Sequence, residues 1–109
     1  MANNFKNFKS RNVGTSAVTV YTCPASTQTT VIGLSVANTS ASPITTDVYI
    51  TSGGLDFYLV KAATVPVGGS LVIAGGDQKV VLEAADALKA VMSAASSADV
   101  VSSLLEITP

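Results

Sequence analysis

The sequence predicts an all-β protein of the sandwich or barrel type. Three observations lead to this fold class. Beyond residue 15 the chain consists of short runs rich in β-branched residues, many of these runs alternate apolar and polar residues, and clusters of Gly, Pro, Asn and Ser separate them about every 8 to 15 residues. A chain of 109 residues is long enough for one such domain and too short for two. We therefore expect a single core.

Eight strands are expected, each bounded by turn residues. Their ranges are 16–22, 30–38, 45–51, 57–63, 70–73, 79–82, 88–93 and 99–107. The turns at 23–26, 38–43, 52–54, 66–69 and 75–77 supply residues that adopt a positive φ, fix φ or bond to nearby backbone. The stretch 82–96 leaves an alternative open, because its helix formers place Leu88, Val91 and Met92 at helical spacing. A strand is the preferred prediction there.

Alternation within the strands predicts which side chains face the core. The residues expected to be buried are Ile32, Leu34, Val36, Leu59 or Val60, Val101 and Leu105, with Val18, Val20, Val48, Ile50 and Ile107 as further candidates for the same face. Side chains next to them in a strand point the other way. Thr19, Tyr21, Asp47 and Tyr49 are therefore expected to face solvent or a partner.

The first 14 residues differ from the rest and are expected to form an extended N-terminal arm, followed by a β-domain over residues 15–109. The arm carries Lys6, Lys9 and Arg11 and no acidic residue, whereas the body holds three lysines and all seven acidic residues, a net charge of −4. Phe5 and Phe8 are its anchors, too few to form a core of their own. The arm is thus complementary in charge to the body.

Neither a secretory signal nor a transmembrane helix is expected. No apolar region follows the cations of the arm, so we expect no secretory signal and infer synthesis in the cytoplasm. Apolar runs are broken well before the roughly 20 residues that a transmembrane helix needs. A membrane is therefore not expected among the partners.

The residue types needed for common catalytic sites are scarce. There is no His, the most frequent general base, and no Trp. The single Cys23 has neither a second Cys nor a His to pair with, so we expect a small apolar filler near a turn. The acid pairs Glu83 with Asp86 and Asp77 with Glu83 have no obvious apolar pocket or cation beside them. We expect solvated turn residues and no enzyme.

Cofactor and metal sites are not expected either. Asp47, Asp56 and Asp77 do not follow the alternating spacing of a calcium loop. The glycine pair at 75–76 lacks the Lys and the Ser or Thr of a phosphate-binding loop, so a turn is the simpler interpretation.

Two classes of binding protein remain as alternatives. A nucleic-acid-binding protein is suggested by the aromatic and basic neighbours of the arm, but a body of net charge −4 repels phosphate and three cations give only salt-sensitive affinity. A glycan-binding protein would need a stacking surface. Four aromatic residues could form one, although core and interface positions are the more common use of such residues: Tyr21, Tyr49, Phe57 and Tyr58.

The shortage of charge points to extensive contacts in an assembly. Charged residues make up 12% of the chain, about half of the usual quarter, while hydrophobic residues make up 48%. Interface cores are depleted in charged side chains. A monomeric, Ser- and Thr-rich β-domain is the alternative explanation.

The order of motifs resembles small virion structural proteins of tailed bacteriophages. The resemblance rests on AVTVYTCPASTQTTVIGLSVANTS, then FYLVKAATVPVGGSLVIAGGDQKVVLEAADAL, then a closing DVVSSLLEIT, and covers residues 18–108. The chain departs from the pattern at Ala85, Ala87 and Ala90, where Gly and β-branched residues are common. The resemblance implies an antiparallel β-sandwich, immunoglobulin-like or jelly-roll-like, in a phage particle.

The resemblance does not fix which part of the particle the chain occupies. Small size, a charge-poor body and an arm that could lie along a neighbour favour a head decoration or cement protein that bridges capsid subunits. The alternative is a neck, tail or fibre-attachment component. Expected partners are other virion proteins, either the major capsid protein or neck and tail proteins, together with further copies of the chain. Nucleic acid, cofactors and metals are not expected. The candidate interaction residues lie in the arm: Phe5, Lys6, Phe8, Lys9 and Arg11. We expect the arm to dock on an acidic surface of another subunit and to be dispensable for folding.

Overall fold

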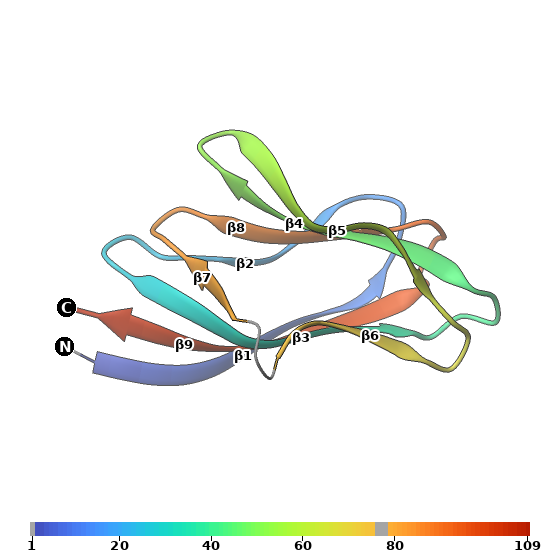
Figure 1. Ribbon diagram of the computed structural model, residues 1–109, viewed down its shortest axis with the longest axis horizontal. Coiled ribbons are helices and arrows are strands. Elements are labelled where there is room, and N and C mark those ends of the chain that lie inside the picture. The colour runs from blue at the N-terminus through green and yellow to red at the C-terminus, as the bar shows by residue number, and fades with distance from the viewer. Residues whose placement is uncertain (1, 76–78) are drawn as a thin grey trace.

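A computed structural model describes residues 2–75 and 79–109 as two antiparallel sheets packed face to face (Figure 1). The described residues form β1 (Ala2–Val13), β2 (Val18–Thr22), β3 (Gln28–Asn38), β4 (Ile44–Ser52), β5 (Leu55–Val65), β6 (Ser70–Ala74), β7 (Val80–Leu82), β8 (Ala87–Met92) and β9 (Ala98–Thr108). One sheet has the order β1-β9-β3-β6, with β7 also paired to β3, and the other has the order β2-β8-β4-β5. The predicted all-β, antiparallel sandwich is confirmed.

The eight strands expected from the sequence are all present, with ends that differ by at most two residues. In the stretch 82–96, β8 forms and the helical alternative is wrong. Ala85 there has a φ of 73°, a left-handed conformation that a helix does not contain. The predicted turn at 75–77 lies largely outside the described residues, and so does Asp77.

Turn chemistry places the strands as expected. Gly53 and Gly54 have φ values of 61° and 81°, as the two-residue hairpin between β4 and β5 requires. Asn38 ends β3 with a buried amide that donates to the carbonyl oxygens of Ser42 at 2.9 Å and Val65 at 3.1 Å. These bonds hold the loop after β3 against the end of β5.

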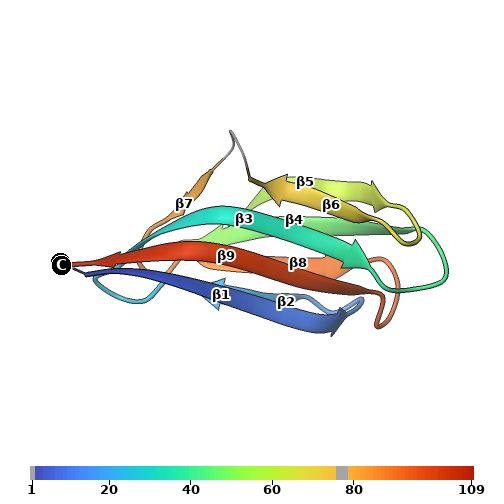
Figure 2. The same cartoon turned by 90° about the horizontal axis from the view of Figure 1, so that it is seen from below.

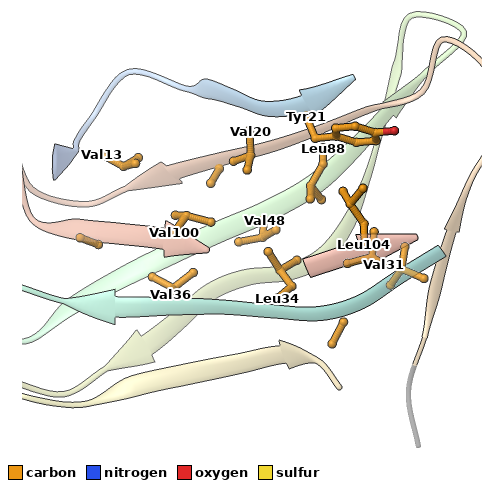
Figure 3. Packing of buried hydrophobic residues seen from close by; sticks show 14 of the residues in the cluster. Val13, Val20, Tyr21, Val31, Leu34, Val36, Val48, Leu88, Val100 and Leu104 are labelled. Carbon is orange, nitrogen blue, oxygen red and sulfur yellow. The ribbon is translucent and has the colours of Figure 1, made fainter. Parts of the chain in front are cut away.

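The core lies between the sheets and consists mainly of Val and Leu (Figure 3). Leu34 and Leu104 from one sheet meet Val48 and Leu88 from the other, and each of these side chains is almost completely buried. Burying a side chain of this size contributes about 1.5–3 kcal/mol. Leu34 and Val36 confirm two of the predicted core positions.

The prediction for β9 was wrong by one residue. Val100, Ser102, Leu104 and Glu106 face the core, whereas Val101 is 44% exposed and Leu105 is only partly buried. The segment VVSSLL repeats each residue type in pairs, so both faces have nearly the same hydrophobic pattern and periodicity cannot choose between them. Glu106 and Ser102 are tolerated inside because each makes hydrogen bonds there.

Irregularities in register explain the other errors. The pairing of β2 with β8 shifts between Thr19 and Tyr21, and Val20 and Tyr21 are both buried, although Tyr21 was expected outside. A similar shift between Val31 and Gly33 accompanies the incomplete burial of Ile32. Tyr49 was also expected outside, but it is covered by the ring of Tyr58. The other core candidates, Val18, Ile50, Leu59, Val60 and Ile107, are partly buried.

The segment expected to be an arm is extended and lies along β9 of the same chain. Residues 2–10 pair one by one with residues 108–100, and Val13 pairs with Ala98 after a shift in register. Val13 is 1% exposed and belongs to the core. In this conformation the segment is therefore the edge strand β1 of the five-stranded sheet (Figure 2).

Candidate interaction surfaces

The five arm residues singled out from the sequence do not form one surface, because strand geometry points them in alternate directions. Lys6 and Phe8 point inward, where the Lys6 Nζ lies 2.9 Å from Glu106 Oε1 and the Phe8 ring lies 4.6 Å from that of Tyr21. Phe5 is 76% exposed and points the other way. Lys9 donates to Asn7 Oδ1 at 2.7 Å, and Arg11 is exposed.

A buried polar network joins β1 to the rest of the sandwich. The Tyr21 hydroxyl donates to Glu106 Oε2 at 2.6 Å and also contacts Thr29 Oγ1 at 2.8 Å. Since the single hydroxyl proton of Tyr21 goes to the carboxylate, Thr29 is the donor in the second bond. The thiol of Cys23 lies 3.3 Å from Thr29 Oγ1 and is buried, in line with its expected place near a turn.

This network lowers the pKa of Glu106. The hydrogen bond from Tyr21 has the largest effect and the bond from Lys6 the next, and together they outweigh the burial of the carboxylate, which acts in the opposite direction. Burial, helped by the bond to Glu106, raises the pKa of Tyr21. The tyrosine therefore stays protonated as a donor and the glutamate stays charged as an acceptor.

Stability should fall in acid because of Glu106. A carboxyl group whose pKa is lower in the folded state stabilises the fold above its unfolded pKa of about 4.3, and this contribution disappears as the pH falls through the folded value. Glu106→Gln removes the titrating group, so its midpoint of urea unfolding should depend less on pH than that of the wild type between pH 7 and pH 3. Equal pH dependence of the two midpoints would contradict this role of Glu106.

The five-stranded sheet seen in Figure 2 carries an apolar surface on its outer side, which we call the apolar face. Residues paired across strands point to the same side of a sheet. One row across it is Phe5, Leu105, Thr30 and Val81, and another is Lys9, Val101, Ser35 and Val72. The four exposed large side chains of these rows are Phe5, Val72, Val81 and Val101.

Between these rows lies a line of small and polar residues, Asn7, Ser103 and Gly33. A Cβ added to Gly33 would meet only the Cβ of Ser103, at 3.9 Å, so nothing fills the space above it. A shallow hollow of about 250 Å³ lies here beside Phe5, with Ile32 and Ser103 among its lining residues. The apolar face therefore consists of two ridges with a groove between them.

A second apolar surface is the tip of the hairpin that joins β4 to β5, which projects beyond the rest of its sheet (Figure 1). Leu55 and Phe57 are exposed there and share one face of β5, and we call them the hairpin tip. Tyr58 is also exposed but lies on the other face of the strand. Tyr58 packs on Tyr49 with ring centres 5.0 Å apart, and the Lys61 Nζ lies 4.3 Å from the centre of the Tyr58 ring. The sequence did not single out Leu55, because a lone Leu after two glycines has no distinctive pattern.

The aromatic residues considered for glycan binding are not brought together. Tyr21 and Tyr49 are buried, and only Phe57 and Tyr58 are exposed. They occupy neighbouring positions on one strand, so their side chains point to opposite faces. The four residues therefore do not form a common stacking surface.

Another hollow, of about 470 Å³, lies at the end of the sandwich where β9 ends. Its lining residues are Ser26, Thr27, Gln28, Glu83, Ala84, Ile107, Thr108 and Pro109. Glu83 has the single charged side chain among these residues. The Asp86 carboxylate instead accepts a hydrogen bond from the Glu83 backbone N–H at 2.9 Å, as a turn residue does.

Metal-ligating groups do not converge within the described part of the chain: no cluster of three acidic or Cys side chains is found there. The same residues include no helix long and apolar enough to cross a membrane.

No protein-family model matches the sequence, and no curated protein matches it either. Solved structures nevertheless share its fold over almost its whole length. One is a chain from Bacillus endospore appendages, described as a family of disulfide-linked pili, with a TM-score of 0.55, 16% identity, and coverage of 98% of this chain and 87% of the other.

A second similar structure comes from the acid-stable capsid of Helicobacter pylori bacteriophage KHP30. Its TM-score is 0.57 at 10% identity, and the match covers all of this chain and 90% of the other. The shared property is the fold. At these identities the β-sandwich alone is common to the three chains.

Proposed function

We propose that this chain is a non-catalytic structural protein of a tailed-phage virion that decorates the head and bridges capsid subunits. The observation that carries the proposal is the presence of two separate exposed apolar surfaces, the apolar face and the hairpin tip, on a chain with few charges. Contiguous exposed apolar surface on a small protein marks a contact site. The fold shared with a chain from a phage capsid structure supports a structural role in a phage particle.

Bridging requires contact with two neighbours at once, and the positions of the two surfaces suit this requirement. The apolar face belongs to the β1-β9-β3-β6 sheet and the hairpin tip to the opposite sheet. One chain then has separate surfaces for two partners. We propose that the hairpin tip contacts the shell, because a projecting apolar tip enters a depression on a partner more readily than a flat sheet does.

A neck or tail location is the second candidate, and it has support of its own. The fold also occurs in a pilus, so it is compatible with a filament. Those pili are disulfide-linked, however, whereas Cys23 is buried in this chain and is not placed to link subunits. Of the two candidates, we propose the head position.

The hairpin tip provides the test. Particles produced with Leu55→Ser and Phe57→Ser combined should retain less than a tenth of the wild-type amount of this protein, because each lost apolar anchor costs about 1–2 kcal/mol of contact. Quantitative mass spectrometry of purified particles measures the occupancy.

The matched control is Val67→Ser, at a turn residue that is 52% exposed and lies outside both surfaces. Its occupancy should equal that of the wild type. Full occupancy of the hairpin variant would show that the hairpin tip does not contact the shell.

A further inference from the structure

We infer that the apolar face binds the same face of a second copy, forming a two-fold dimer in which Phe5 of each copy enters the hollow beside Phe5 of the other. The inference goes beyond the proposed virion role and does not depend on it, since purified protein suffices to test it.

The first argument is that the apolar face is self-complementary. Phe5 is the most exposed of the large apolar side chains, and the adjacent hollow of about 250 Å³ is lined by Ile32 and Ser103 among others. An interface between two identical surfaces needs a protrusion and a matching recess on the same patch. A different partner would need only one of them, so the presence of both favours a second copy.

The second argument is the contrast between the two outer faces of the sandwich. In the two ridges of the apolar face, the single charged side chain is Lys9, which lies on the edge strand and can stay hydrated at the rim of a contact. The opposite sheet carries Asp47, Lys61 and Lys89, with Asp47 Oδ1 accepting from the Ala62 N–H at 2.7 Å and Lys61 placed over a ring. On the outer side of the five-stranded sheet, Asp99 adds a charge near the start of β9, whereas the two ridges carry only Lys9. The ridges are therefore poorer in charge than the opposite sheet.

The third argument is size. A stable dimer buries about 800 Å² on each partner. The molecule measures 45 × 28 × 22 Å, and the five-stranded sheet seen in Figure 2 spans its longest and shortest dimensions. This area is sufficient for a standard interface. Stacked sheets pack about 10 Å apart, a spacing at which the ridges of one copy reach the groove of the other.

Sedimentation equilibrium of the purified chain tests the inference. The wild type should form dimers at micromolar concentrations. Phe5→Asp should raise the dimer dissociation constant at least 30-fold, because it removes the side chain that enters the hollow of the other copy and places a charge there. Val101→Asp, on the other ridge and another strand, should act in the same direction, whereas Val67→Asp should leave the dissociation constant unchanged.

Far-UV circular dichroism of each variant monitors folding, which these exposed positions should preserve. A wild type that is monomeric at all concentrations would overturn the inference. So would a dimer that persists in both ridge variants or dissociates equally in the Val67 control. Unfolding of both ridge variants would contradict the exposed positions on which the inference rests. The dimer is measured without particles, so failure of the virion proposal leaves this result unaffected.

Discussion

Replacing Tyr21 by alanine should lower the free energy of unfolding by about 3–5 kcal/mol, the usual cost of removing a buried aromatic side chain. Tyr21 is 3% exposed and packs against Phe8 of β1. Its hydroxyl is also the donor that satisfies Glu106. The change therefore leaves a cavity and takes one hydrogen bond from a buried carboxylate. Urea unfolding at pH 7 measures the loss.

Tyr21→Phe separates the two contributions. It keeps the ring and removes only the hydroxyl, whose bond to a charged group is worth about 1.5–3 kcal/mol. Its effect should be smaller than that of alanine. Equal losses for the two variants would assign the whole effect to the hydroxyl, and a loss below about 1 kcal/mol for alanine would contradict the burial of this side chain.

Deleting residues 2–11 should lower the free energy of unfolding by several kcal/mol. This is a large part of the roughly 5–15 kcal/mol that is typical of a small domain. From the sequence alone the segment is expected to be dispensable, but three contacts now argue otherwise. Lys6 pairs with Glu106, Phe8 covers Tyr21, and the Phe8 carbonyl accepts from Ser102 Oγ at 2.9 Å. Without them a buried carboxylate loses its cation and β9 becomes an open edge.

Deleting only residues 2–4 is the matched control. It shortens the same strand but keeps Lys6, Phe8 and the core residue Val13. Its stability should stay within about 0.5 kcal/mol of the wild type, as is usual for exposed positions. If the longer deletion unfolds at the same urea concentration as the control, β1 is not part of the stable sandwich. Docking of this segment on another subunit stays a prediction in either case.

Turn residues explain why the strand boundaries could be predicted. The glycines at 53–54 and 68–69, together with Asn38, impose local conformations that depend little on the rest of the chain. The N-terminal strand could not be predicted in this way. Its residues are mostly Asn, Lys and Ser, which have low strand propensity, and its pairing is supplied by the distant β9.

Side-chain direction was the less predictable part. In β9, duplicated residue types make both faces similar, and the deciding feature is the contact of Glu106 with Tyr21, 85 residues earlier in the chain. The apolar face could not be predicted for a similar reason. Phe5, Val72, Val81 and Val101 come from four strands and meet only through sheet order. No local pattern in the sequence reports this arrangement.

The two proposed contacts together would make the protein bivalent. A dimer through the apolar face presents two hairpin tips, and binding of one tip raises the effective concentration of the other at the shell. Weak contacts at each tip could then hold the dimer firmly across neighbouring capsid subunits. The proposed dimer thus supplies a physical route to the proposed bridging role.

The ratio of this chain to the major capsid protein in purified phage particles tests the central proposal most directly. Quantitative mass spectrometry with isotope-labelled peptides from both proteins gives this ratio. A head decoration protein should be present in a fixed ratio of the order of one copy for each capsid subunit or capsomer, because its sites repeat over the whole shell. A copy number equal to a single ring, or absence from the particles, would contradict a role as a head decoration protein.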